Sequence, residues 1–169
     1  MNIRKADLSD ARGIAEVHVD SWITTYRNII PDEYLNQLTF EARERLWASN
    51  LANCDVFVAE DEKGKIIGFA DNGKERTGKY ENLEGEVYSI YILAEHQAQG
   101  VGHRLLKRVI HDLLDKGINS MLIWVLKENR ACGFYEKMGG QIVDTKSREI
   151  SGKQLMEVAY GWEDIKVLA

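Results

Sequence analysis

One segment near the middle of the chain restricts the fold more than any other. Residues 86–93 are rich in Tyr, Ile and Val, which predicts a β-strand. Residues 120–126 form a nearly continuous apolar run, as expected for a strand that is covered on both faces. Between them lies an amphipathic helix that stops at Lys116 and Gly117, with an apolar side made of Val101, Leu105, Leu106, Val109, Ile110, Leu113 and Leu114. A strand, a helix and a strand in this order imply a right-handed crossover between two parallel neighbours.

The flanking segments predict antiparallel strands and further helices. Further strands are expected at residues 2–6, 55–60, 65–71, 141–150 and 154–160, with hairpin turns at residues 62–64 and 151–152. Helices are expected at residues 9–21, 32–52 and 129–138, with Thr39 as an internal cap of the second helical region. The fold class is therefore α/β in the α+β mixed sense: a mixed, mostly antiparallel sheet with helices on both faces and one parallel pair.

The length and the apolar pattern limit the organisation of the chain. With 169 residues, we expect a single domain over residues 1–169. The longest apolar run has six residues, from Met121 to Leu126, against the roughly 20 that span a bilayer, so no membrane contact is expected. The first ten residues are charged and lack an apolar stretch, which predicts a cytoplasmic protein without a signal peptide. Cys54 and Cys132 lack metal-ligand or disulfide spacing, so we expect buried thiols and no metal.

The charge distribution separates one segment from the rest. Twenty-seven acidic and 22 basic side chains give a net charge of −5, which disfavours nucleic-acid binding. Residues 96–111, in contrast, contain no Asp or Glu and carry Arg104, Lys107, Arg108 and three histidines. A local anion site is therefore expected in this segment.

The loop from Gln97 to Gly102 lies between the central strand and the amphipathic helix. Its two glycines let a ligand approach the backbone, and the free N–H groups of a first helical turn bind phosphate. Such glycines also occur for packing alone. The dinucleotide fingerprint and the P-loop both require a glycine where this chain has Leu105, so neither common nucleotide motif is present.

Two motifs in this order resemble the GNAT superfamily of acyl-CoA-dependent N-acetyltransferases. The first is Q/R-x-x-G-x-G/A at residues 97–102, and the second is N-x-x-A/C-x-x-F-Y-E-K-x-G at residues 129–139. The resemblance implies the GNAT fold, in which the parallel strand pair is splayed by a bulge. One departure is Gly140, where the family usually has an aromatic residue, and we expect weaker packing of the following strand.

The resemblance also implies acetyl-CoA as cosubstrate, with no metal. The backbone around Gln99 to His103 would hold the pyrophosphate, and the freed backbone groups at Ile90 and Ile92 would pair with pantetheine. Asn129 would contact pantetheine as well, although Asn is also a favoured helix cap. The expected cofactor-binding residues are Ile90, Ile92, Gln97, Gln99, Gly100, Val101, Gly102, His103, Asn129 and Tyr135.

The resemblance implies two catalytic residues. Tyr135 would protonate the departing CoA thiolate, which is reasonable for a phenol with a pKa near 10, or it is simply a half-buried aromatic residue. An ammonium acceptor must lose a proton before it attacks, and Glu86 occupies the family position for a base that works directly or through water. Tyr88 and His18 are substitutes for this role. Glu86 would otherwise be a solvated carboxylate at a strand end.

The first helix is the expected acceptor side. His18, Trp22 and Tyr26 follow at a spacing of four and share one face if the helix persists, and we group them with Tyr88 as substrate-binding candidates. The same spacing is typical of core residues. The expected partner is an amine of a small molecule or peptide, and the acidic balance suits polyamines, amino sugars or lysine-bearing peptides without selecting one. An acyl-CoA-binding sensor or scaffold without turnover is the alternative, and family members often form homodimers.

Overall fold

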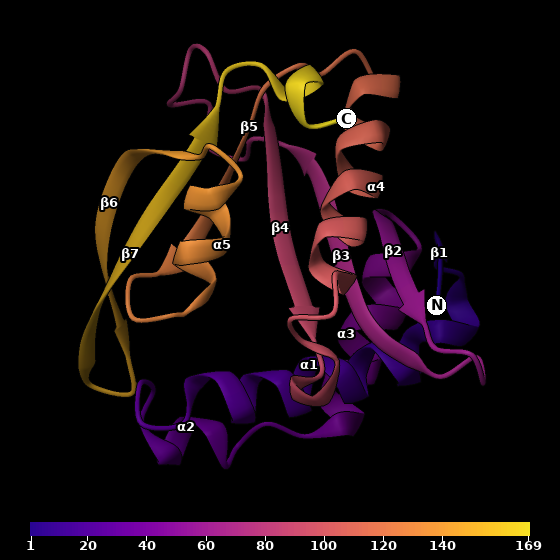
Figure 1. Ribbon diagram of the computed structural model, residues 1–169. Helices are drawn as coiled ribbons and strands as arrows, with labels where there is room; N and C mark the ends of the chain where they lie inside the picture. Colours follow the sequence, from indigo (N-terminus) through magenta and orange to yellow (C-terminus); the bar gives the residue numbers. More distant parts are fainter.

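The computed structural model describes residues 1–169 and contains a single seven-stranded sheet in the order β1-β2-β3-β4-β5-β7-β6 (Figure 1). The strands are β1 (Asn2–Lys5), β2 (Asp55–Glu60), β3 (Ile66–Lys74), β4 (Gly85–Ile92), β5 (Met121–Leu126), β6 (Gln141–Ile150) and β7 (Lys153–Trp162). The helices are α1 (Ala11–Tyr26), α2 (Asp32–Leu35), α3 (Phe40–Leu51), α4 (Val101–Asp115) and α5 (Ala131–Lys137). Only β4 and β5 run parallel, and every other neighbouring pair is antiparallel. The predicted mixed sheet is confirmed.

Two of the three helical regions differ from the expectation at a boundary. The first helix continues five residues beyond Ser21 to Tyr26, because no glycine or proline stops it and Tyr26 is buried at its end. The second helical region is interrupted as expected, and Thr39 Oγ1 accepts a hydrogen bond from Ala42 N at 3.2 Å to begin α3. Helix α5 begins only at Ala131, since Asn129 is part of the preceding turn.

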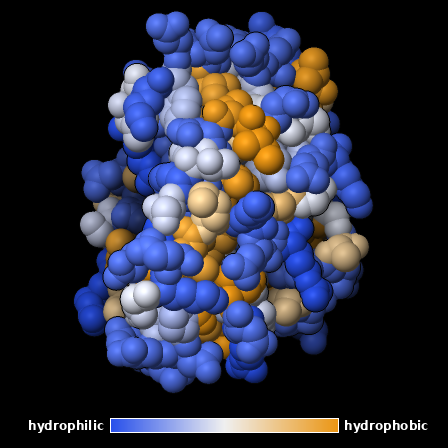
Figure 2. Space-filling model, turned by 90° about the vertical axis from the view of Figure 1, so that its left-hand side faces the viewer, coloured by the Kyte–Doolittle hydropathy of each residue, from blue (hydrophilic) through white to orange (hydrophobic).

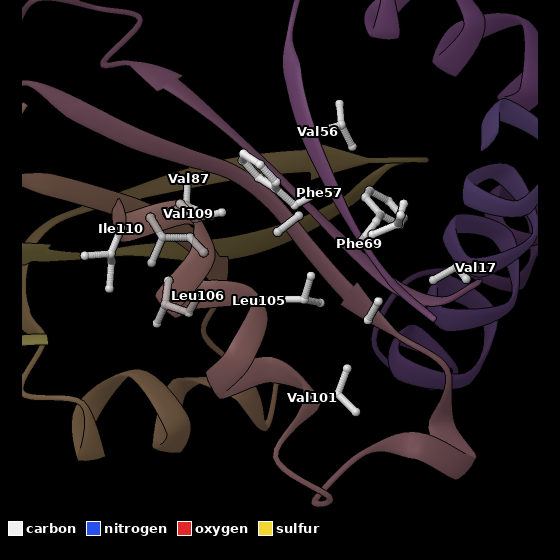
Figure 3. Packing of buried hydrophobic residues seen from close by; sticks show 14 of the residues in the cluster. Val17, Val56, Phe57, Phe69, Val87, Val101, Leu105, Leu106, Val109 and Ile110 are labelled. Atoms are coloured by element: carbon white, nitrogen blue, oxygen red, sulfur yellow. The ribbon is translucent and has the colours of Figure 1, made fainter. Parts of the chain in front are cut away.

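The core lies on both faces of the sheet. Phe69 of β3 packs against Trp47 on the face covered by α1 and α3, whereas Phe57 of β2 packs under Arg108 of α4 on the other face. Figure 3 shows Phe69 beside Val17 of α1, with the apolar residues of α4 gathered on the opposite side. All the predicted apolar residues of α4 are buried except Leu114, which is half-buried. This packing holds β4 between two helical layers.

The parallel pair is short and splayed. Only residues 85–87 of β4 pair with β5, at Met121 to Ile123. On the other side of β4, Val87 faces Asn72 and Ser89 faces Asp71, so Tyr88 is the extra residue of a β-bulge. Beyond this bulge, the backbone edge of β4 that faces β5 has no strand partner. The splayed pair implied by the family resemblance is therefore confirmed.

The strand that follows Gly140 is largely exposed: Ile142 is 56% exposed and Val143 is 42% exposed. A Cβ atom at Gly140 would lie 2.6 Å from Cζ2 of Trp162, which is itself buried. The Trp162 indole nitrogen donates a hydrogen bond to the Met138 carbonyl at 2.9 Å, and its ring meets Tyr135 edge-on. An aromatic side chain from β7 thus fills the space beside α5 that a residue at position 140 would otherwise occupy.

The outer side of the sheet is formed by β6 and β7. Ile142, Val143 and Met156 are exposed there, and Figure 2 shows apolar side chains in a strip through a largely hydrophilic surface. Both cysteines are free and half-buried rather than fully buried. No helix of the chain is long and apolar enough to cross a membrane.

Candidate active site

The splay between β4 and β5 opens into a cavity of about 1010 Å³. Its walls come from the C-terminal half of α1, the free part of β4, the start of α4, β5, α5 and the β6–β7 hairpin. Eleven of the predicted site residues line it: Trp22, Tyr26, Tyr88, Ile90, Ile92, Gln97, Gly100, Gly102, His103, Asn129 and Tyr135. The site therefore forms where the two halves of the sheet separate.

The start of α4 presents free backbone N–H groups to the cavity. Gly100 has a φ of +82° and no side chain caps the helix after it, so the first-turn amides keep their hydrogen-bonding capacity. A Cβ atom at Gly102 would lie 3.2 Å from Cδ1 of Ile92, so a side chain there would crowd the cavity wall. Gln97 ties this loop to β4 by donating from Nε2 to the Ile92 carbonyl at 3.1 Å. This end of the cavity suits an anionic ligand.

Two predicted residues of the loop turn their side chains away. Gln99 donates from Nε2 to the Glu95 carbonyl at 2.7 Å and does not line the cavity. The Val101 side chain is 2% exposed and belongs to the core. Neither residue is among those that line the cavity.

Asn129 has both of the roles weighed from the sequence. Its Oδ1 accepts a hydrogen bond from Ala131 N at 2.9 Å, as in a cap. Its Nδ2 donates to Tyr26 Oη at 3.3 Å across the cavity. The side chain therefore shapes the turn after β5 and joins that turn to the end of α1.

Tyr135 lines the cavity from α5. Its side chain packs against Phe134, Tyr160 and Trp162, and the residue is only 4% exposed. Its hydroxyl forms no hydrogen bond with another group of the chain, and burial raises the pKa of this phenol. The hydroxyl therefore keeps its proton at neutral pH and is available as a donor.

Glu86 lies below the cavity rather than on its wall. It is 2% exposed, and both carboxylate oxygens contact Arg76: Nη2 is 2.6 Å from Oε1 and Nε is 3.2 Å from Oε2. The Arg76 guanidinium in turn lies 4.5 Å from the centre of the Tyr88 ring, and Tyr88 Oη donates to the Lys74 carbonyl at 2.7 Å. Arg76 and Tyr88 therefore stand between Glu86 and the cavity.

His18 belongs to the aromatic core and is separated from the two residues that follow it at helical spacing. Its Nδ1 accepts a hydrogen bond from Trp47 Nε1 at 2.9 Å, and its ring stacks on Tyr91. Burial lowers the pKa of His18 to about 4, so the imidazole is neutral. Trp22 and Tyr26 do line the cavity, and the Trp22 indole N–H is buried there without a hydrogen-bond partner.

Several residues that line the cavity were not predicted from the sequence. Lys146 and Arg148 lie two residues apart on β6 and share the Glu157 carboxylate of β7, at 3.5 Å and 3.0 Å. Lys146 also lies 4.0 Å from the centre of the Trp124 ring. The period-two spacing of the two cations on a predicted strand was the available signal, because such residues point to the same face.

The charge of the cavity is opposite to that of the chain. Five arginine or lysine residues but only two glutamates line it: Arg27, Arg76, Arg130, Lys146 and Arg148 against Glu128 and Glu157. The chain as a whole carries −5. A cationic lining concentrates anionic ligands and disfavours polycations. The acceptor preference read from the net charge alone is thus not supported by the local charge.

Comparisons with known proteins bear on the family and the fold. A family model described as "Acetyltransferase (GNAT) family" matches residues 18–140. "Uncharacterized N-acetyltransferase YuaI" of Bacillus subtilis (strain 168) is 44% identical over 168 residues, which are 99% of this chain and 96% of that protein. "L-amino acid N-acyltransferase MnaT" of Escherichia coli (strain K12) is 29% identical over 157 residues, covering 90% and 86%. The fold matches that of YncA from Salmonella typhimurium, solved with its cofactor acetyl-CoA, with a TM-score of 0.72 at 22% identity and coverage of 96% and 92%.

Proposed function

Because this chain belongs to the acetyltransferase (GNAT) family, we propose that it transfers the acetyl group of acetyl-CoA to the primary amine of a small molecule or peptide. Attack takes place directly in a ternary complex. The observation that carries the proposal is the cavity between β4 and β5, which places an unpaired strand edge, an uncapped helix start and the Tyr135 hydroxyl around one space.

The residues present fit acetyl-CoA. The pyrophosphate would accept hydrogen bonds from the backbone N–H groups at the start of α4, beside His103. The amide groups of pantetheine would pair with the backbone edge at Ile90 and Ile92, as an added strand does, although the Ile92 carbonyl also accepts a hydrogen bond from Gln97 Nε2. Asn129, in the turn after β5, also lines this cavity. The structure of YncA from Salmonella typhimurium, which has the same fold and was solved with its cofactor acetyl-CoA, supports this assignment.

Proton transfers are divided between the two faces of the sheet. Tyr135 lies on the side of α5 and would give its proton to the thiolate as the C–S bond breaks. The attacking amine would approach from the side of α1, where Trp22, Tyr26 and Tyr88 line the cavity. Its proton must go to a base on that side, and Glu86 is the base proposed from the sequence. Glu86 acts in this role only after Arg76 moves away from its carboxylate.

The lining of the acceptor side supports an amine that also carries a carboxylate. Lys146 and Arg148 share a single glutamate, which leaves one positive charge, and the Trp22 indole N–H lacks an acceptor. Such groups complement an oxygen anion and repel polyamines. An L-amino acid N-acyltransferase among the relatives agrees with this choice.

The proposal is tested by thiol release from acetyl-CoA in the presence of single amines, with mass spectrometry of the product. We expect acetyl-CoA to bind in calorimetry and at least one α-amino acid to yield an N-acetyl product. Absence of acetyl-CoA binding at millimolar concentration would contradict the proposal. Tight binding without product for amino acids, polyamines, amino sugars and lysine peptides would instead indicate the alternative, a sensor or scaffold.

A further inference from the structure

A buried carboxylate and a hydroxyl meet beside the bulge of β4. Asp71 of β3 is 6% exposed, and it lies directly opposite Ser89 of β4 in the sheet register. Ser89 Oγ donates a hydrogen bond to Asp71 Oδ1. Ser89 is partly exposed and lines the cavity, whereas Asp71 lies behind it and does not. The hydroxyl thus connects a buried carboxylate with the space in which the amine would react.

The surroundings of Asp71 favour proton uptake near neutral pH. No side chain forms an ion pair with this carboxylate, in contrast to Glu86, which Arg76 binds through both oxygens. Burial raises the pKa of Asp71 to about 6, against the hydrogen bond from Ser89 and the more distant charge of Arg76, which lower it. A base with a pKa close to the working pH combines availability with driving force.

Apart from the Arg76–Glu86 ion pair, the groups described around Asp71 and Ser89 are neutral. Tyr88 and Tyr91 of β4 lie within electrostatic reach of Asp71, and burial raises the pKa of both phenols, so both are neutral. From α1, His18 stacks on Tyr91 and is neutral for the reason given above. Arg76 is the one cation that acts on Asp71, and it is engaged by Glu86.

We infer that Asp71, acting through the Ser89 hydroxyl, receives the proton that the acceptor amine releases when it attacks the thioester. This inference rests on the proposed function. The acceptor enters as the neutral amine, its ammonium proton left in the solvent. As the N–C bond forms, the proton on nitrogen passes to Ser89 Oγ while the Ser89 proton passes to Asp71 Oδ1. The C–S bond breaks and the sulfur takes the Tyr135 proton. Asp71 then returns its proton to solvent and Tyr135 regains one, so the reaction produces an amide and free CoA thiol.

The test compares pH profiles of kcat from pH 5 to 9 for the wild type and for the variants Asp71→Asn, Ser89→Ala and Glu86→Gln, with one acceptor amine throughout. Using one acceptor cancels the titration of the amine itself. We expect Asp71→Asn to lower kcat by roughly 10²-fold or more and to remove the fall in rate below about pH 6. Ser89→Ala should show the same change, and Ser89→Thr, which keeps a hydroxyl, should restore most of the rate. Ser49→Ala, on the exposed face of α3, is the matched control without effect.

Circular dichroism of each variant shows whether Asp71→Asn folds. If it does not, the Ser89→Ala and Ser89→Thr pair decides, because Ser89 is partly exposed and the alanine leaves the sheet intact. The inference is overturned if Ser89→Ala retains the wild-type rate and profile while Glu86→Gln loses the acidic limb. The base would then be Glu86 and the proposed function would stand. Loss of the proposed function itself would show as absence of acetyl transfer by the wild type.

Discussion

Arg76 binds both carboxylate oxygens of Glu86, and its backbone N–H donates to Oε2 of the same carboxylate at 3.2 Å. The pair is asymmetric, because the Arg76 side chain is 61% exposed while that of Glu86 is 3% exposed. An exposed cation thus neutralises a buried anion next to the acceptor side of the cavity.

Removal of this cation should destabilise the protein. Arg76→Met leaves the Glu86 carboxylate buried without its partner, and we expect the free energy of unfolding to fall by about 1 to 3 kcal/mol in urea titrations. The double variant Arg76→Met/Glu86→Gln should regain part of this loss, since an amide is cheaper to bury than a charge. An Arg76→Met protein as stable as the wild type would show that the pair contributes nothing to folding.

Tyr135 should affect turnover without affecting stability. Tyr135→Phe keeps the ring and its contacts with Trp162 but removes the proton donor, so we expect kcat to fall by roughly 10- to 10²-fold with an unchanged midpoint of thermal unfolding. Tyr160→Phe is the matched control, because its hydroxyl donates to Glu136 Oε1 at 2.7 Å away from the reacting groups. That variant should keep its kcat. Equal rates for Tyr135→Phe and the wild type would assign thiolate protonation elsewhere.

The cations on β6 should select the acceptor. Glu157 neutralises only one of the two cations Lys146 and Arg148, and Lys146→Met removes the remaining positive charge. We expect KM for an α-amino acid to rise about tenfold, which corresponds to about 1.4 kcal/mol. The amide and the decarboxylated amine of the same amino acid should be little affected. Lys63→Met, in the exposed turn between β2 and β3, is the charge-matched control. A Lys146→Met variant with wild-type KM values for both the amino acid and its decarboxylated amine would contradict this role.

The buried His18 should lower the free energy of unfolding at acidic pH. Its pKa is about 4 in the folded chain against the ordinary 6.5, so the unfolded chain binds more protons between these values. Stability is therefore fully present above pH 6.5 and is lost as the pH falls towards 4, by about 3 kcal/mol. His18→Gln preserves an acceptor for Trp47 Nε1 and should lose this dependence in urea titrations at pH 7 and 4.5.

Asp71 has the opposite effect on the pH dependence of the free energy of unfolding in the same pH range. Its pKa is raised in the folded chain, so stability from this group increases as the pH falls through about 6. Each group is therefore measured as the difference between the wild type and its own single variant. If His18→Gln follows the wild-type pH dependence, the imidazole is charged in the folded chain.

The parallel strand pair and the glycine loop before α4 were predictable from the sequence because both depend on local patterns. The apolar side of α4 and the strand on either side of it determine the crossover, and Gly100 with Gly102 marks the loop. A bulge in the central strand was implied only by the family resemblance, and its place at Tyr88 came from the structure, since an extra residue leaves no change in the composition of a strand.

The roles of individual side chains were less predictable because they depend on contacts between distant segments. His18 and Trp22 share a helix face, yet only Trp22 lines the cavity. The His18 imidazole lies in the core, where it accepts a hydrogen bond from Trp47 of α3. Similarly, Trp162 lies 22 residues after Gly140 and supplies the aromatic ring that a motif comparison looks for next to Gly139. Packing of α1 against α3 decided the first outcome, and packing of β7 against α5 decided the second.

The short pairing of β4 with β5 also determines how the molecule opens. Strands β1 to β4 and strands β5 to β7 form two leaves that share hydrogen bonds along only three residues of each strand. Amide hydrogens at the free end of β4 should therefore exchange with solvent faster than those of β3, which has a partner on both sides. A ligand that bonds to this edge and to α5 bridges the leaves, so that they unfold as one cooperative unit and hydrogen exchange slows in both.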